Sequence, residues 1–334
     1  MHISVIIPTH NRSEALDLTL EHLAKQEFAG EWEAVVVNNN SMDDTAEVIA
    51  KWQAKFPVDL RTVDEKTPGP AAARNAGAKA ATGEFLVFID NDILVDEHFL
   101  SLHIKTLRKN PGCWFIGRVK NPGNLRDTPF GRYRDDLHES SFVSLPPDAL
   151  ADYDGATGQN WAMRREEFLV TGGFDESYPI ASCEDAELAL RARRNGYRTM
   201  FNPRSVVIHN DWAIDIQTFC RRQELYSIPS VLLWTKYGDT SIQLEMVREN
   251  GPISWNEDSL RRIGKKSAKG IASKILMQSV TSWICRVVER FAPDSGLSRK
   301  AYRTATALAI FRGVREGFKR YGHLRNGKGD TVGL

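Results

Sequence analysis

Residues 85–92 read Phe-Leu-Val-Phe-Ile-Asp-Asn-Asp, an apolar run that ends in two acids and an amide. A uniformly apolar run of this length predicts a strand buried in a parallel sheet. Asp90 and Asp92 then stand just past the strand, where two carboxylates can share Mg²⁺ or Mn²⁺. The alternative is a turn with Asx hydrogen bonds ahead of a helix. The position after a buried strand favours the metal.

Around this stretch, short β runs alternate with helical segments. This alternation predicts a parallel α/β sheet with right-handed crossovers, whose ligands bind beyond the carboxyl ends of the strands. The other predicted strands lie at 3–7, which Pro8 ends, and at 34–37, 58–63 and 206–208; helices are predicted from 13, after 44, at 71–81 and at 184–195, with Gly196 at the C′ position.

The remainder of the chain has a different character. Residues 118–157 are rich in Pro and Gly, which predicts a loop-rich region that holds an acceptor. Beyond 215 the pattern is mostly helical, and 259–290 and 299–321 carry apolar residues on one side and basic residues on the other. We therefore expect a catalytic domain at 1–215 and a helical region at 216–334.

Other chemical candidates stand at element ends. Asp185 follows Glu184 at a predicted helix start, where it can act as a base or complete a capping box with Ser182. His209 ends a strand, as a metal ligand or a buried structural side chain. Arg74 begins a small-residue helix, which suits phosphate binding or simply close helix–sheet packing. No P-loop motif is present.

Composition narrows the possible classes. The chain has 334 residues and a net charge of +1, which gives no general attraction to nucleic acid. Four cysteines without a C-x-x-C pair do not suggest a zinc site. The N-terminus lacks the pattern of a secretory signal, and no charge-free run of about 20 residues occurs, so a cytoplasmic protein is expected. Basic clusters on the late helices predict solvated faces or contact with an anionic membrane.

Taken in order, several segments resemble the family 2 glycosyltransferases, which have the GT-A fold. The resemblance covers about residues 2–212. It rests on residues 5–12, 36–45, 73–77, 83–92, 172–176 and 184–191.

The resemblance implies roles for individual residues. Asp185 would be the catalytic base of an acidic pair with Glu184, Asp92 would be the direct metal ligand, and His209 would meet the metal or the diphosphate. The remaining implied residues would bind the nucleotide or the donor sugar: Pro8, Thr9, Arg12, Asn39, Arg74, Asp90, Asn91, Gly172 and Gly173.

The implied activity is inverting, Mn²⁺- or Mg²⁺-dependent transfer from a nucleotide sugar to a saccharide, lipid-linked or protein acceptor. UDP is favoured over GDP and dTDP as the carrier, although the acid expected near residues 38–40 is replaced by Asn. A Q-x-x-R-W motif is missing, which argues against a processive synthase. The alternatives are a sugar nucleotidyltransferase, whose Gly-rich loop is absent, and a non-catalytic sugar-nucleotide binder. The C-terminal helices suggest peripheral membrane contact or a homodimer.

Overall fold

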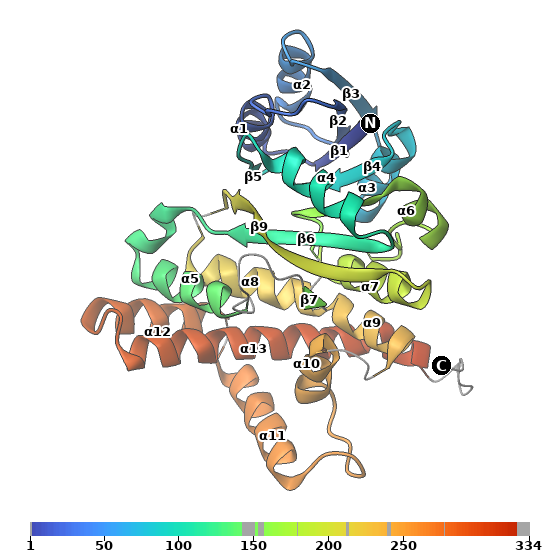
Figure 1. Cartoon of the computed structure of the whole chain (residues 1–334). Coiled ribbons are helices and arrows are strands. Elements are labelled where there is room, and N and C mark those ends of the chain that lie inside the picture. Colours follow the sequence, from blue (N-terminus) through green and yellow to red (C-terminus); the bar gives the residue numbers. More distant parts are fainter. Residues whose placement is uncertain are drawn as a thin grey trace. The chain divides into compact units, whose positions relative to one another are not determined.

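The computed structural model describes residues 2–141, 151–152, 157–178, 180–211, 214–238, 242–276 and 278–325 (Figure 1). The chain divides into two compact units. The first comprises Met1–Pro122 and Glu139–Trp212, and the second comprises Gly123–His138 and Ala213–Leu334. The functional domains expected at 1–215 and 216–334 stay a prediction.

The first unit is built on one mixed sheet with the strand order β3-β2-β1-β4-β8-β6-β9-β5, and β7 pairs with β9. Pairing is parallel from β3 to β4 and between β6 and β9, and antiparallel elsewhere. The predicted α/β class is therefore confirmed, with antiparallel members that the sequence patterns did not reveal. The strands are β1 (His2–Thr9), β2 (Glu31–Asn38), β3 (Asp59–Asp64), β4 (Phe85–Phe88), β5 (Ile93–Leu94), β6 (Cys113–Lys120), β7 (Ala151–Asp152), β8 (Trp161–Arg164) and β9 (Arg198–His209).

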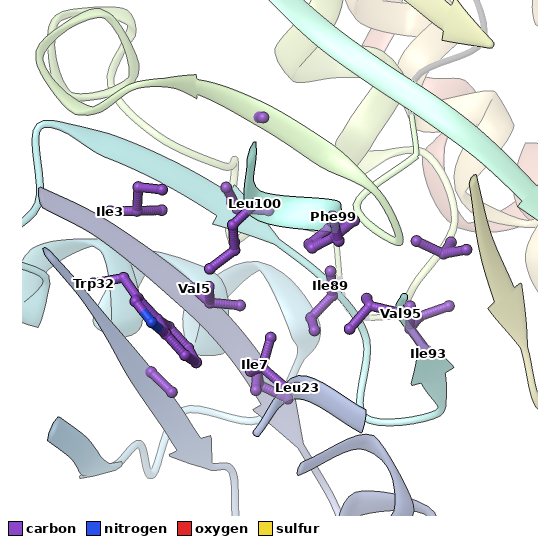
Figure 2. Close-up of a cluster of buried hydrophobic side chains, with 14 of the residues drawn as sticks. Ile3, Val5, Ile7, Leu23, Trp32, Ile89, Ile93, Val95, Phe99 and Leu100 are labelled. Carbon is purple, nitrogen blue, oxygen red and sulfur yellow. The ribbon is translucent and has the colours of Figure 1, made fainter. Parts of the chain in front are cut away.

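Helices cover both faces of this sheet. Alternate β1 residues point to opposite faces, so Val5 packs in one cluster with α1, α2 and α4, while Ile6 packs in another with α3, α6 and α7. Figure 2 shows the first cluster around Val5, Ile89 and Phe99. The helices are α1 (Ser13–Leu23), α2 (Thr45–Gln53), α3 (Pro70–Ala80), α4 (Phe99–Lys109), α6 (Arg165–Thr171) and α7 (Glu184–Arg194).

The structure tests two predictions about where a helix and a strand end. Gly196 has a φ of 87° just past α7, which confirms the predicted C′ position. β1 continues through Pro8 to Thr9, although the prediction ended it at Pro8. The ladder with β4 stops at Ile6, so at Pro8 the strand has a neighbour on one side only, and a residue without an N–H is tolerated there.

The region expected to be loop-rich contains more regular structure than predicted. It includes the 3₁₀ helix η1 (Gly123–Asp127) and α5 (Pro129–Ser141). Pro129 stands at the first helical position, where its missing N–H costs nothing, and Thr128 Oγ1 accepts a hydrogen bond from the Gly131 N–H at 3.0 Å. Pro129, one of the prolines that predict a loop in the sequence, therefore marks the start of a helix. Residues 142–150 and 153–156 of this region lie outside the described residues.

The second unit is helical, which confirms the predicted helical extension (Figure 1). Its longest helix, α13, packs against α8, α9 and α12. Tyr302 of α13 lies in a buried cluster with Phe130 of α5 and Cys285 of α12. The helices are α8 (Ile216–Ser227), α9 (Pro229–Tyr237), α10 (Ile242–Asn250), α11 (Leu260–Ile275), α12 (Gln278–Phe291), α13 (Gly296–Tyr321) and the 3₁₀ helix η2 (Gly322–Arg325).

None of the helices described in either unit has the length and apolarity needed to cross a membrane.

Candidate active site

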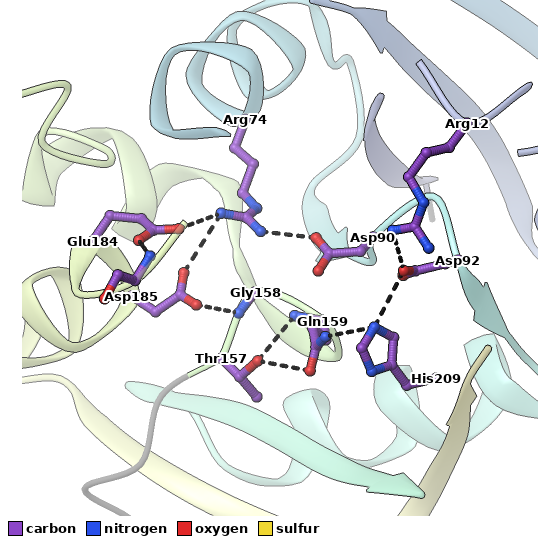
Figure 3. Close-up of polar contacts among 11 residues, drawn as sticks. Arg12, Arg74, Asp90, Asp92, Thr157, Gly158, Gln159, Glu184, Asp185 and His209 are labelled. Carbon is purple, nitrogen blue, oxygen red and sulfur yellow. Dashed lines mark hydrogen bonds and ion pairs between the residues drawn. The ribbon is translucent and has the colours of Figure 1, made fainter. Parts of the chain in front are cut away.

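Polar side chains from several strand ends meet at one edge of the sheet, as the sequence predicts. β1, β2 and β4 are parallel neighbours, so their carboxyl ends lie together. Residues 90–92 begin two residues after the end of β4, and His209 ends β9. Figure 3 shows the result as two linked clusters, one around Arg74 and one around Asp92.

The loop after β1 is held in an unusual backbone conformation. Asn11 and Arg12 have φ values of 58° and 66°, in the left-handed region. Asn91 holds this loop and its flanks, because its Nδ2 donates to Thr9 Oγ1 at 2.8 Å and to the Asn11 carbonyl at 3.4 Å, and its backbone oxygen accepts from Thr19 Oγ1 at 2.9 Å. Asn91 is itself buried. Its side chain thus shapes the loop that places Arg12 in the site.

The side chain of Asn39 forms hydrogen bonds with backbone groups of the protein. Its Nδ2 donates to the carbonyls of Glu65 and Thr67, both at 2.7 Å, and its Oδ1 accepts from the Gly69 N–H at 2.9 Å. These bonds tie residues 65–69 to the end of β2. The side-chain bonds in this structure therefore give Asn39 a positioning role, and the predicted contact with a base stays a prediction.

Asp92 forms the first cluster with Arg12 and His209. Arg12 Nη1 donates to Asp92 Oδ2 at 2.6 Å, and His209 Nε2 lies 3.2 Å from the same oxygen. Burial would raise the pKa of Asp92, but the hydrogen bonds and charges of His209 and Arg12 outweigh it and lower that pKa. Burial likewise opposes a rise in the pKa of His209, which Asp92 nevertheless brings about. Each side chain therefore favours the charged form of the other, and His209 must release its proton before its imidazole can bind a metal.

The same cluster offers an unused ligand atom. Asp92 Oδ1 is buried and has no hydrogen-bond partner. Among the described residues, no group of three His, Cys, Asp or Glu side chains gathers to form a complete metal cage. Mg²⁺ and Mn²⁺ sites often use one or two protein ligands and complete their shell with substrate phosphates. Asp92 and His209 fit a site of that open kind.

Arg74 forms the second cluster with three carboxylates. Its Nη2 donates to Asp90 Oδ1 at 2.8 Å, and its Nη1 donates to Glu184 Oε1 at 3.0 Å and lies 3.7 Å from Asp185 Oδ1. The Arg74 side chain is only 3% exposed. Burial acts to lower the pKa of Arg74, but the carboxylates raise it above its ordinary value. A permanent positive charge therefore sits between β4 and α7.

Glu184 and Asp185 share the first turn of α7 but have different surroundings. Glu184 is fully buried, with Oε2 accepting from the Ser182 N–H at 2.6 Å. This bond replaces the predicted capping box, because the helix begins at Glu184 and Ser182 lies one residue before the N-cap, Cys183. Glu184 therefore anchors the helix start.

Asp185 is the carboxylate that stays available for chemistry. Its Oδ2 accepts from the Gly158 N–H at 2.8 Å, while its Oδ1 is buried without a hydrogen-bond partner. Burial, followed by the charge of Glu184, raises the pKa of Asp185 to about 7 against the opposing effects of Arg74 and Gly158. A carboxyl group that titrates near neutrality is suited to accept a proton.

Gly172 and Gly173 form the turn after α6, with φ values of 90° and 68°. A Cβ at Gly173 would lie 2.6 Å from Asn75 Oδ1. Asn75 holds the following residue on both sides, since it accepts from the Phe174 N–H at 2.8 Å and donates to the Phe174 carbonyl at 2.9 Å. Gly173 is thus packed against α3, and its predicted approach to a donor sugar stays a prediction.

Two residues near the site carried no sequence signal. A Cβ at Gly158 would lie 2.7 Å from Arg74 Cζ, so only glycine lets the chain pass this close to the guanidinium. Gln159 Nε2 lies 3.3 Å from His209 Nε2, which joins the two clusters (Figure 3). A single Gly or Gln belongs to no motif, so sequence patterns do not reveal either residue.

The N-terminal half of the chain is similar to a known protein family. Residues 4–168 match the family model described as Glycosyl transferase family 2. Over 101 residues the chain is 36% identical to the poly(ribitol-phosphate) beta-N-acetylglucosaminyltransferase TarS of Staphylococcus aureus. That match covers 30% of this chain and 18% of TarS, so the chain spans about a fifth of the length of this relative. The glycosyltransferase AglE of Haloferax volcanii is 23% identical over 86% of this chain and 93% of its own.

Solved structures confirm the GT-A fold. A mannosyltransferase from Pyrobaculum calidifontis, in complex with GDP-Man and Mn²⁺, has a TM-score of 0.59 at 21% identity, covering 93% of this chain and 86% of that one. TarS residues 1–349 in complex with UDP give a TM-score of 0.52 at 19% identity, covering 96% of this chain and 92% of that one. The family match favours a glycosyltransferase over the nucleotidyltransferase alternative.

Proposed function

We propose, from the membership of residues 4–168 in glycosyl transferase family 2, that this chain is an inverting glycosyltransferase that uses a nucleotide-sugar donor. The observation that carries the proposal is the environment of Asp185, a carboxylate whose buried Oδ1 accepts no hydrogen bond and whose pKa is raised to about 7. We assign it the role of general base, within a catalytic domain at about 1–215.

The reaction needs one base and one displacement. Asp185 takes the proton of the acceptor hydroxyl, and the acceptor oxygen forms a bond to the anomeric carbon of the donor. The bond from that carbon to the diphosphate breaks as the new bond forms, so a nucleoside diphosphate leaves and the anomeric centre inverts. Arg74, held between Asp185 and Asp90, keeps a positive charge beside the base and the donor.

Asp92 and His209 are the residues that would hold a divalent cation such as Mn²⁺ or Mg²⁺. The unpartnered Oδ1 of Asp92 supports this assignment. When bound, the cation neutralises charge on a diphosphate leaving group. Arg12, already bonded to Asp92 Oδ2, adds a fixed positive charge next to the same place.

The donor is proposed as a UDP sugar, ahead of GDP and dTDP sugars. The two structural relatives described above were solved with UDP and with GDP-Man, so the fold accommodates either carrier. The acceptor is proposed as a hydroxyl of a saccharide, a lipid-linked saccharide or a protein. The place of action is proposed as the cytoplasm, at the membrane surface, in the biosynthesis of a polysaccharide.

The Asp185→Asn variant tests the base directly. Asparagine keeps the size of the side chain but cannot take a proton, so release of nucleoside diphosphate from the donor should fall by about 10²–10⁴-fold. Donor affinity, measured by calorimetry, should stay unchanged. Asp59→Asn, at an exposed position on β3, is the matched control and should keep full turnover. Full turnover in Asp185→Asn would refute the assignment.

A further inference from the structure

The second unit presents apolar side chains to solvent on two consecutive helices, α11 and α12. Ile275 of α11 is 69% exposed, and Phe291 of α12 is 80% exposed. Large apolar side chains gathered at the surface mark an interaction site. In Figure 1, α11 projects beyond the other helices of this unit.

The exposed residues of each helix lie on one side. In α11, Leu260, Ile271 and Ile275 are spaced by eleven and four residues, which returns to the same face of a helix. In α12, Val280, Trp283 and Phe291 are spaced by three and eight residues and also share a face. Cys285, on the opposite side of α12, is buried in the core of the unit. Each helix thus has an uncovered apolar stripe, and we use the name apolar face for these two stripes, which α11 and α12 each carry separately.

Basic side chains border the apolar face. The α11 sequence, from Leu260 to Ile275, contains Lys and Arg but no Asp or Glu. Some of these cations have internal partners: Arg262 pairs with Glu249 at 2.6 Å and Lys266 pairs with Asp258 at 2.7 Å. The cations that are exposed on α11 and α12 are Arg261, Lys265, Lys274, Arg286 and Arg290.

We propose that the apolar face binds an anionic lipid bilayer, with α11 and α12 lying in the plane of the interface. Apolar residues on one side of a helix, including Trp and Phe, with Lys and Arg beside them, are the features that hold a helix in the headgroup region. The negative surface of an anionic leaflet complements the exposed cations.

A second copy of this chain is the less suitable occupant. In a symmetric dimer the same patch meets itself, so the exposed cations of one copy would face those of the other. Like charges placed together across an interface oppose association. The charge pattern therefore distinguishes a bilayer from a homodimer. The inference is independent of the chemistry proposed for the first unit.

The test is flotation of the full chain with two kinds of vesicle, phosphatidylcholine alone and equal parts of phosphatidylcholine and phosphatidylglycerol. We expect the protein to float with the anionic vesicles and to stay in the soluble fraction with the neutral ones. Added salt should weaken the binding, because it screens surface charge. A protein that stays soluble with both kinds of vesicle, or floats equally with both at all salt concentrations, overturns the proposal.

Variants separate the two parts of the surface. Lys265→Gln and Lys274→Gln should each weaken binding to anionic vesicles about fivefold. The double variant Ile271→Ser, Ile275→Ser should lose flotation, whereas Val170→Ser should not, because this side chain is equally exposed but lies on α6 in the first unit. Thermal unfolding checks that every variant is folded. Unchanged flotation of the α11 variants, or a wild-type dimer that these substitutions convert to a monomer, contradicts the lipid assignment.

Discussion

Arg74 supplies the positive charge that balances the carboxylates near the carboxyl ends of the strands. Three carboxylates approach its guanidinium, and two of the three belong to the start of α7. Removing a buried partner leaves uncompensated charge behind, so these side chains depend on one another. The same charge also acts on the pKa of Asp185, which it lowers against the effect of burial.

The pH dependence of turnover follows from this arrangement. Asp185 acts as a base only when deprotonated, so kcat/KM should rise with pH and level off above a pKa of about 7. Arg74→Gln removes the charge that lowers this pKa, so its profile should shift to higher pH. Arg74→Lys keeps the charge and should shift the profile less.

Arg164→Gln is the control for this measurement, because Arg164 pairs with Glu84 at the surface of the same unit. Its profile should coincide with that of the unaltered protein. A kcat/KM that does not vary between pH 5.5 and 8.5, or a profile for Arg74→Gln that moves to lower pH, would contradict the role given to Asp185 (this range extends about 1.5 units to either side of the raised pKa).

At the level of single residues, sequence patterns find charged groups and miss the groups that hold them. Asp90, Asp92 and Asp185 follow an apolar strand or begin a helix, so their positions are visible in the sequence. Gly158 and Gln159 are not, because their importance comes from a distant part of the chain that folds against them. For Asn39 the position at the end of β2 was visible, but its backbone partners were not.

Among the elements, α3 depends on small residues for its approach to the sheet. A Cβ at Gly77 would lie 2.4 Å from Ile6 Cγ2 and 2.9 Å from Val37 Cγ2, and both of these side chains are buried. The predicted close helix–sheet packing of the segment 69–77 is therefore present. Because Arg74 lies on the same helix, this packing also sets how close its guanidinium lies to the sheet.

Gly77→Ala should therefore destabilise the first unit by about 1–3 kcal/mol, the usual cost of overpacking a core. Gly264→Ala is the matched control in α11, where a Cβ meets nothing within 4 Å. It should stabilise its helix by roughly 0.5–1 kcal/mol, because alanine is the better helix former. Urea unfolding measures both changes. A Gly77→Ala protein as stable as the unaltered one would show that α3 does not pack as described.

Elements with a continuous apolar run were predictable, and elements defined by their neighbours were not. β1, β2 and β4 are apolar runs whose character does not depend on context. β8 is a four-residue strand that pairs antiparallel between β4 and β6, and its short sequence has no period to detect. α5 was missed because Pro129, which breaks a helix interior, instead begins one.

For the whole molecule, the class of fold followed from the alternation of strands and helices, and the helical region followed from its amphipathic pattern. The division of the chain into units did not follow from the sequence, because Gly123–His138 belongs to the same unit as Ala213–Leu334. Sequence periodicity describes neighbours along the chain, whereas a unit is defined by contacts between distant segments. Membrane contact of the second unit was one of two alternatives from its basic clusters, and the exposed apolar side chains that favour it are identified by the structure.

We propose that the strand-end site binds a nucleoside diphosphate with the help of a divalent cation. Thermal unfolding with UDP, GDP, dTDP or CMP, each with and without Mn²⁺, measures this binding. A ligand at about 100 times its dissociation constant adds roughly 2.7 kcal/mol to the free energy of unfolding. We expect one nucleotide, UDP first, to raise Tm only when Mn²⁺ is present, and Asp92→Asn to abolish that dependence. A Tm that no nucleotide changes, with or without Mn²⁺, would contradict the account.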